Sequence, residues 1–208
     1  MRITSALGRP LVIGLTGGIG SGKTLVGRVF HALGCDLYIS DQEAKKVYND
    51  EGVKESVLCL LGPQSYQMES PDFAYISSQV FQDDQKLTAL NGIIHPAVKR
   101  RFSTFVARAS VGSIIIKETA ILFESKGAED CDFVITVNAR QESRIERVKN
   151  RDGHTEEHIH ERMAKQMRDG ERSKLSDFTI SNNNEDMVLP QVISIIDQLK
   201  VSGKVQIH

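Results

Sequence analysis

The stretch LVIGLTGGIGSGKT, from Leu11 to Thr24, decides the fold of this chain. It begins with an apolar, β-branched run over Leu11–Thr16, continues as a glycine-rich turn, and leads into a helical pattern over Leu25–Leu33. The turn fits G-x-x-x-x-G-K-[ST] at every fixed position and stands in the strand–loop–helix context that this motif requires. The sequence therefore predicts a phosphate-binding loop (P-loop) at the end of a buried strand.

The residue types in this loop have chemical reasons. Glycines let the backbone fold around a phosphate and turn N–H groups toward it, and the following helix directs the positive end of its dipole at the same anion. Lys23 supplies charge for the β- and γ-phosphates, and the Thr24 hydroxyl can ligate Mg²⁺. The alternative is a glycine-rich turn with a chance Lys-Thr pair. We expect a nucleoside-triphosphate site, with ATP contacts at Gly18, Ile19, Gly20, Ser21, Gly22, Lys23, Thr24 and Leu25.

Further apolar runs have the character of strands and alternate with helical patterns. Nearly continuous apolar runs are typical of strands that are buried on both faces of a parallel sheet, and their alternation with helices predicts a layered α/β fold. We therefore expect an α/β P-loop NTPase three-layer fold with a five-stranded parallel sheet, formed by Leu11–Thr16, Leu37–Ile39, Ser113–Lys117, Phe133–Val137 and Phe178–Ile180.

The lengths of the connections predict one P-loop domain over 1–208 with two insertions. The nucleotide-binding core comprises 11–41, 110–139 and 175–208. Residues 42–109 are too many for a plain strand–helix–strand crossover and read as a helical insertion, with helices at Asp41–Asn49, Val53–Leu61, Gln79–Gly92 and Ala97–Arg108. Residues 140–174 are dense in charge and are expected to form an exposed lid.

Composition excludes several classes of protein. Lys+Arg 26 against Asp+Glu 27 gives a net charge of −1, so no overall field draws the chain to nucleic acid or to an anionic membrane. Three cysteines without CxxC spacing favour neither a disulfide framework nor a zinc site. No apolar run approaches the ~20 residues that span a bilayer. We expect a cytoplasmic protein with no nucleic-acid or membrane partner, whose residues 1–10 are a short leader before the first strand.

Other residues favour a small phosphotransferase over other P-loop proteins. The Asn-Lys-x-Asp motif of switch GTPases does not occur, and Ser113–Lys117 is followed by the single acid Glu118 rather than by the Asp-Glu pair expected of a motor or remodelling ATPase. A phosphotransferase needs a base for the acceptor hydroxyl, an acceptor-binding insertion and a lid of arginines. The chain has a candidate for each.

Asp41 is the candidate base, because ligands gather at the carboxyl ends of strands in such sheets. A helix N-cap is an equal and compatible interpretation of this residue. In the lid, arginines recur at spacings of four, three and four, which places them on one helical face that could clamp phosphates; they are Arg140, Arg144, Arg147 and Arg151. The alternative is a solvated face paired with Glu142 and Glu146, but the P-loop favours Arg147 and Arg151 as ATP contacts.

The histidines carry weaker signals. His154, His158 and His160 form a cluster that could bind a metal, although a solvated helix with an N-cap at Thr155 is favoured. His95-Pro96 is expected to separate two helices, since proline is common at the first helical position.

Taken together, these residues show that the chain resembles the dephospho-coenzyme A kinase family over residues 11–196. The matching pieces are LTGGIGSGKT at 15–24, Ser40-Asp41, the segment from Val80-Phe81 to Ile94-His95-Pro96, ILFE at 121–124, Arg147-x-x-x-Arg151-Asp152 followed by Arg162-x-x-x-Gln166, and Asn182-Asn183.

The resemblance implies transfer of the ATP γ-phosphoryl group to the ribose 3′-hydroxyl of dephospho-coenzyme A, the last step of coenzyme A biosynthesis, with Mg²⁺. It implies a general base at Asp41, acceptor binding in the helical insertion, including His95, and an adenine loop that includes Asn183. On the P-loop template, Lys23 and Arg151 complete the catalytic set, and Thr24 holds Mg²⁺, with Glu118 as a candidate through water. Another small-molecule or nucleotide kinase, or a non-catalytic nucleotide-binding protein, remains the alternative.

Overall fold

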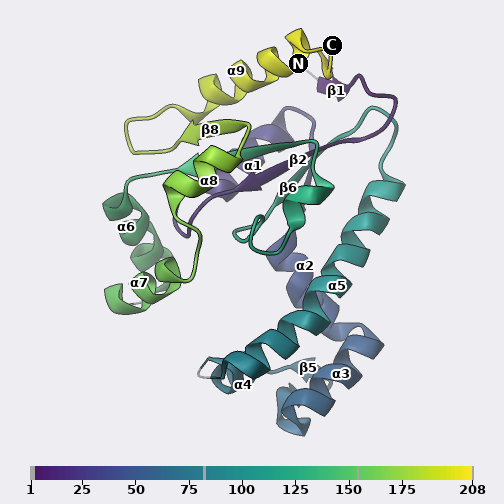
Figure 1. Ribbon diagram of the computed structural model, residues 1–208, viewed down its shortest axis with the longest axis vertical. Coiled ribbons are helices and arrows are strands. Elements are labelled where there is room, and N and C mark those ends of the chain that lie inside the picture. Colours follow the sequence, from purple (N-terminus) through teal and green to yellow (C-terminus); the bar gives the residue numbers. More distant parts are fainter. Residues whose placement is uncertain (1–2, 82, 154, 208) are drawn as a thin grey trace. The chain divides into compact units, whose positions relative to one another are not determined.

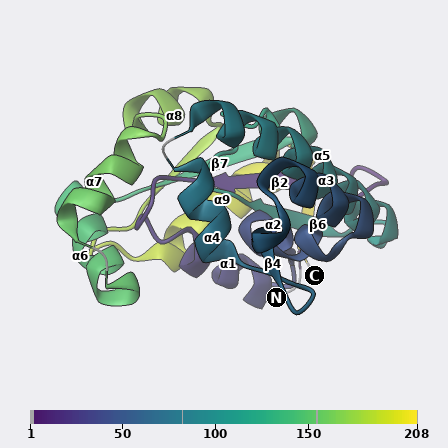
Figure 2. The ribbon, with the colours of Figure 1, turned by 90° about the horizontal axis from the view of Figure 1, so that it is seen from below.

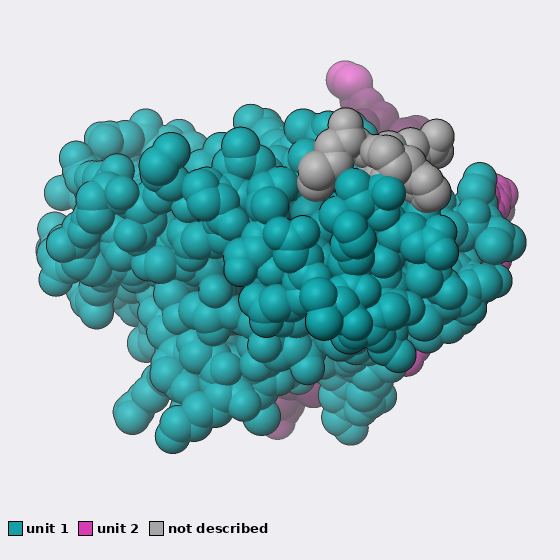
Figure 3. Space-filling model, turned by 90° about the horizontal axis from the view of Figure 1, so that it is seen from above, with its two compact units in different colours: residues 1–39, 109–208 teal, residues 40–108 magenta. Residues whose placement is uncertain are grey.

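The computed structural model describes residues 3–81, 83–153 and 155–207. The chain divides into two compact units, one of residues 1–39 and 109–208 and the other of residues 40–108, which Figure 3 shows in two colours. We call them unit 1 and unit 2. Unit 1 holds the P-loop, and unit 2 holds the inserted helices.

Unit 1 is built on a parallel sheet with the strand order β3-β6-β2-β7-β8. All six residues of the central strand are buried, as its apolar, β-branched sequence predicts. The expected α/β fold with five parallel strands is confirmed. The strands are β2 (Leu11–Thr16), β3 (Asp36–Ile39), β6 (Ile114–Glu118), β7 (Phe133–Asn138) and β8 (Phe178–Ser181).

The sheet is covered on both faces, which gives three layers (Figure 1). Helices α1 (Lys23–Ala32) and α9 (Val188–Val201) cover one face, where Phe30 and Val192 are fully buried in the main core. The other face lies against residues 119–131, which include η3 (Gly127–Asp130). There the fully buried Leu122 packs on Gly14, a position where a Cβ would lie 2.7 Å from the leucine side chain.

Residues 140–174, which we call the helical arm, lie together on one side of unit 1 (Figures 1 and 2). The arm comprises α6 (Gln141–Asp152), α7 (Glu156–Ala164) and nearly all of α8 (Asp169–Leu175). Thr155 caps α7 through its side chain, as expected. The arm's small apolar core contains Val148 and Ile159.

Unit 2 has an apolar core of its own, in which Val47 and Val57 are fully buried. A two-stranded hairpin over residues 66–71 connects two of its helical segments. The elements are α2 (Ser40–Lys46), η1 (Val47–Asn49), α3 (Glu51–Leu61), η2 (Pro63–Ser65), β4 (Tyr66–Gln67), β5 (Ser70–Pro71), α4 (Phe73–Val80) and α5 (Asp84–Arg108).

The expected break at His95-Pro96 is wrong, because α5 continues through Pro96. A proline inside a helix costs about 3 kcal/mol in a lost hydrogen bond and a clash. Leu90, Ile94 and Ala97, however, lie on one face and are all buried. Their spacing carries the buried face past the proline, and burial of this face offsets the local cost. The break comes earlier instead, between α4 and α5.

The expected leader also needs correction, because it contains a strand. β1 (Ile3–Ser5) pairs antiparallel with β9 (Val205–Ile207). Asp132 fixes the rest of the segment, since its carboxylate accepts hydrogen bonds from the Arg9 guanidinium and, over 2.9 Å, from the Val12 N–H. Residues 3–10 are therefore part of the folded unit 1.

Candidate nucleotide-binding site

The P-loop turns sharply between the end of β2 and the start of α1, and two glycines make this turn possible. Gly20 and Gly22 have φ values of 77° and 93°, a region that side chains other than glycine rarely adopt. A Cβ on Gly20 would lie 2.4 Å from the Arg144 carbonyl oxygen, and one on Gly22 would lie 2.0 Å from Asn182 Nδ2. Both positions therefore require glycine for its conformation and for its lack of volume.

Lys23 lies over the loop that it follows. Its Nζ donates hydrogen bonds to the carbonyl oxygens of Gly17, over 2.9 Å, and Gly18, over 3.3 Å. α1 begins at this lysine, so the loop also meets the N–H groups of a helical first turn, which have no partners within the helix. A positive charge and a helix N-terminus thus meet at one loop, an arrangement that suits a phosphate. Leu25, another predicted ATP contact, is 52% exposed.

Thr24 contacts a buried carboxylate from the neighbouring strand. Thr24 Oγ1 donates to Glu118 Oε1 over 2.8 Å, and Glu118 is only 6% exposed. The sheet register places this glutamate beside Leu15, near the end of β2. A hydroxyl and a carboxylate are oxygen ligands of the kind that Mg²⁺ binds directly or through water, so these residues fit the ion that a P-loop kinase uses.

The end of β8 supports the P-loop through Asn182. This buried side chain donates from Nδ2 to the Ser21 carbonyl oxygen over 2.7 Å. The neighbouring Asn183, the predicted ATP contact, instead organises the following loop: its Nδ2 donates to Asp186 over 2.7 Å, and its Oδ1 accepts from the Arg140 N–H over 2.8 Å.

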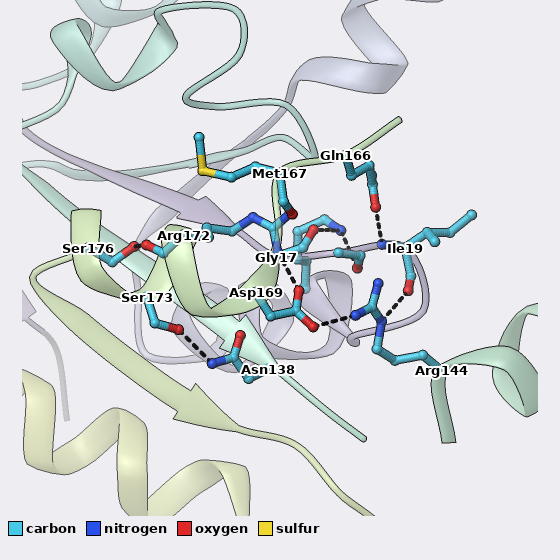
Figure 4. A network of polar contacts seen from close by, with 12 residues as sticks. Gly17, Ile19, Asn138, Arg144, Gln166, Met167, Asp169, Arg172, Ser173 and Ser176 are labelled. Carbon is cyan, nitrogen blue, oxygen red and sulfur yellow. Dashed lines mark hydrogen bonds and ion pairs between the residues drawn. The ribbon is translucent and has the colours of Figure 1, made fainter. Parts of the chain in front are cut away.

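The helical arm reaches the P-loop at Ile19 (Figure 4). Gln166 Oε1 accepts from the Ile19 N–H over 2.8 Å, and Arg144 Nε donates to the Ile19 carbonyl oxygen over 2.8 Å. Burial lowers the pKa of Arg144, and the neighbouring Asp169 carboxylate opposes this shift by favouring the charged guanidinium. Ile19, predicted to contact ATP, therefore has both backbone polar groups bonded to the arm.

The two arginines predicted to contact ATP, Arg147 and Arg151, lie in different surroundings. Arg147 Nη2 donates to Asn184 over 3.1 Å, and its Nη1 is buried without a hydrogen-bond partner among the described residues. Its Nη1 lies 4.0 Å from the Cβ position of Gly22, so this guanidinium borders the P-loop. Arg151 is 65% exposed and is paired with Asp152, through two hydrogen bonds of 2.7 and 2.8 Å.

The family model for dephospho-CoA kinase matches residues 11–187, from the first residue of β2 to the residue before α9. The chain belongs to the dephospho-CoA kinase family. A dephospho-CoA kinase of Bacteroides fragilis is 36% identical over 185 residues, which cover 88% of this chain and 90% of the relative.

Solved structures agree with the family on the fold. A protein from Thermus thermophilus superimposes with a TM-score of 0.83 at 26% identity and covers 91% of this chain and 97% of its own. The dephospho-CoA kinase of Campylobacter jejuni superimposes with a TM-score of 0.66 at 19% identity, with coverage of 92% and 98%.

Two residues that resemblance to dephospho-CoA kinases assigns to the acceptor lie in unit 2. Asp41 is exposed in the first turn of α2, and the exposed His95 lies within α5. Both side chains are therefore accessible in their own unit.

Sequence reasoning missed three contacts of the P-loop in this dephospho-CoA kinase family member: those made by Asn182, Arg144 and Gln166. The matching pieces at 162–166 and 182–183 marked the neighbourhood of two of them. No pattern in the sequence distinguishes an arginine that faces a loop backbone from one that faces a phosphate.

The remaining sequence hypotheses concern metals and membranes. Of the histidine cluster, His154 lies outside the described residues, and His160 Nε2 lies 3.7 Å from Glu156. Among the described residues, no group of three or more His, Cys, Asp or Glu side chains is arranged to hold a metal ion. No helix in the same part of the chain has the length and apolar character that crossing a membrane requires.

Proposed function

We propose that this chain transfers the γ-phosphoryl group of ATP to the ribose 3′-hydroxyl of dephospho-coenzyme A, giving coenzyme A and ADP. The observation that carries the proposal is the family match over residues 11–187, because it includes the whole P-loop. The contacts of Lys23 and Thr24 support the same reaction.

The P-loop is the proposed site of the ATP phosphates. The N–H groups of Gly20, Gly22, Lys23 and Thr24 face the β- and γ-phosphates, and the Lys23 ammonium exchanges its carbonyl contacts for phosphate oxygens. Arg147 offers its buried Nη1 to the same nucleotide, and the loop that Asn183 organises borders the adenine. Apart from the Lys23 side chain, these groups are placed before ATP arrives, so binding requires little reorganisation of the loop.

Thr24 and Glu118 are the proposed holders of Mg²⁺, with the threonine oxygen as a direct ligand and the glutamate acting through water. The bound ion would neutralise charge that develops on the β- and γ-phosphate oxygens. Glu118 also fixes the rotamer of Thr24 through their hydrogen bond, so the hydroxyl oxygen is oriented before the ion binds.

The transfer step is assigned to Asp41 and Arg151. Asp41 takes the proton of the 3′-hydroxyl while the oxygen forms its bond to the γ-phosphorus, and the bond from that phosphorus to the bridging oxygen breaks to release ADP. Arg151 leaves Asp152 to contact the transferred group and excludes water as a competing acceptor. His95 is assigned to acceptor binding.

The proposal assigns a role to each part of the chain. Residues 11–41, 110–139 and 175–208 form the nucleotide-binding core, 42–109 the acceptor-binding insertion and 140–174 the lid. The partners are ATP and dephospho-coenzyme A, with no nucleic acid or membrane. The compartment is the cytoplasm, in keeping with free thiols at Cys35, Cys59 and Cys131.

An acceptor panel tests the proposal. Purified protein with Mg-ATP is offered dephospho-coenzyme A, adenosine, AMP or a nucleoside mixture, and ADP release is followed together with the product mass. We expect one added phosphate on dephospho-coenzyme A alone. Transfer only to a nucleoside or nucleotide would replace this acceptor with another, and ATP binding without any transfer would favour a non-catalytic nucleotide-binding protein.

A Lys23→Ala variant is the control for the panel. Removal of the ammonium group should weaken ATP binding and slow transfer together, because Lys23 serves the phosphates in both. ADP release that persists in this variant would come from a contaminating kinase.

A further inference from the structure

The structure assigns Arg144 and Gln166 as positioning residues that hold the P-loop in its phosphate-binding shape through the backbone of Ile19. The inference rests on the proposed ATP site and adds to it a mechanical connection between the helical arm and the P-loop. All the residues involved belong to unit 1.

Ile19 contacts the arm through both its backbone polar groups and its side chain. Its N–H donates to Gln166 and its carbonyl oxygen accepts from Arg144, each over 2.8 Å. Its side chain, 7% exposed, packs with Val148 of α6 and Ile159 of α7 in the arm's apolar core. A one-residue shift of the P-loop would therefore break two hydrogen bonds and uncover an apolar side chain.

Arg144 also limits the space around the loop. A Cβ at Gly18 would lie 2.1 Å from Arg144 Nη2, and one at Gly20 would lie 2.4 Å from its carbonyl oxygen. The arginine thus lies against the glycine on each side of Ile19. It acts as a backbone support, and its side chain is 8% exposed, which distinguishes it from Arg151 on the same helix.

Two further residues hold Arg144 in place (Figure 4). Asp169 accepts from Arg144 Nη1 over 2.5 Å and from Arg172 Nη1 over 2.7 Å. Arg172 is fully buried and also donates to the Met167 carbonyl oxygen. One carboxylate between two guanidinium groups leaves a net positive charge in this network, which suits a neighbouring phosphate site.

The turn that carries Gln166 is anchored at a second point. The Met167 N–H donates to Glu124 Oε1 over 3.0 Å, and Glu124 belongs to the segment that follows β6. The residue that follows Gln166 is therefore fixed through its N–H and its carbonyl oxygen. Arg144 of α6 and Gln166 of the turn between α7 and α8 both reach this one P-loop residue.

A binding experiment with the full chain tests the assignment. Gln166→Met keeps the length of the side chain and removes the acceptor for the Ile19 N–H. Calorimetry would measure the affinities for Mg-ATP and, separately, for dephospho-coenzyme A. Gln198→Met, on the exposed side of α9, is the matched control.

We expect Gln166→Met to weaken Mg-ATP binding by about tenfold, the usual effect of one lost buried hydrogen bond. The affinity for dephospho-coenzyme A should stay the same, and the control should match the wild type. Equal weakening of both ligands would mean a general loss of structure and would overturn the assignment. Unchanged ATP binding in Gln166→Met would also overturn it.

Arg144→Lys gives a second, independent test, since lysine keeps the charge but cannot support both Ile19 and Asp169 with a planar group. Weaker ATP binding in this variant, with an unchanged melting temperature, supports positioning by geometry, and wild-type affinity contradicts it. Failure of the proposed function is distinguishable, because the wild-type protein would then bind no Mg-ATP or would bind it without transfer to dephospho-coenzyme A.

Discussion

Thr24 Oγ1 donates a hydrogen bond to Glu118 Oε1 over 2.8 Å, and this contact joins the last residue of the P-loop motif to the last residue of β6. The carboxylate is buried, so its charge is poorly screened by solvent. A buried negative charge beside the threonine hydroxyl is suited to hold a cation or the water of a cation. The first prediction follows from this pair.

Replacement of Glu118 by Gln should raise the Mg²⁺ concentration needed for half-maximal ADP release by roughly 10- to 100-fold, the range found when the outer partners of a metal site are changed. Glutamine keeps an oxygen for Thr24 but removes the charge. Titration of Mg²⁺ at fixed ATP checks this. Glu129→Gln, at an exposed position, should behave as the wild type, and an unchanged titration for Glu118→Gln would remove Glu118 from the metal site.

Asp41→Asn should separate binding from chemistry. An amide cannot take the hydroxyl proton, and loss of a general base slows transfer by about 10²- to 10⁴-fold. Mg-ATP affinity should change little, because the phosphates meet Lys23 and the P-loop instead. Single-turnover kinetics and calorimetry measure the two effects. Asp84→Asn, exposed in the first turn of α5, is the control; full turnover in Asp41→Asn would require another base.

Gly22→Ala should abolish ATP binding and destabilise the fold. The φ of 93° costs a non-glycine residue about 1–2 kcal/mol, and the new Cβ would collide with Asn182 at 2.0 Å. Urea denaturation measures the free energy of unfolding. Gly92→Ala is the matched control: it lies inside α5 with open space around it, so it should stabilise the protein by about 0.5–1 kcal/mol.

Asp132→Asn should destabilise the protein in a pH-dependent manner. Burial raises the pKa of Asp132, but the hydrogen bonds from Arg9 and from the Val12 N–H together lower it by more. The pKa of this carboxyl therefore lies below its ordinary value of 3.8. The ionised carboxylate therefore contributes stability that is fully present above pH 3.8 and is lost as the pH falls through the lower, folded-state pKa. Melting temperatures of variant and wild type should differ most near neutral pH and converge as the pH falls through the folded-state pKa of Asp132. A difference independent of pH would contradict the carboxylate's role.

Local patterns in the sequence were sufficient to predict the sheet of unit 1. The five apolar runs all became strands, with bounds that differ by at most one residue at either end. The signal is clearest in β2 and β6, where burial of every residue leaves a continuous apolar sequence. The β1–β9 ladder was missed, since Ile3–Ser5 and Val205–Ile207 are too short to show a period. The continuous α5 was missed because propensity places a break at Pro96, whereas tertiary packing decides otherwise.

The same distinction between local pattern and long-range packing applies to the residues of the candidate site. Lys23 and Thr24 follow from a motif whose shape is fixed locally, so the sequence predicts them. The spacing of the arm's arginines predicts their position around a helix axis, but the rotation of that helix against the P-loop depends on long-range packing. Arg144 therefore became a backbone support and Arg151 lies exposed beside Asp152, a difference that spacing alone does not carry.

The strand that leads into the P-loop has neighbours from far along the chain. β2 pairs with β6 and β7, so a fragment that stops at residue 110 contains every letter of the motif and neither adjoining strand. Closing loops of this length costs chain entropy before any contact is gained. The nucleotide site is therefore complete only when β6 and β7 have joined β2, and ATP affinity is a direct assay for the correct assembly of unit 1.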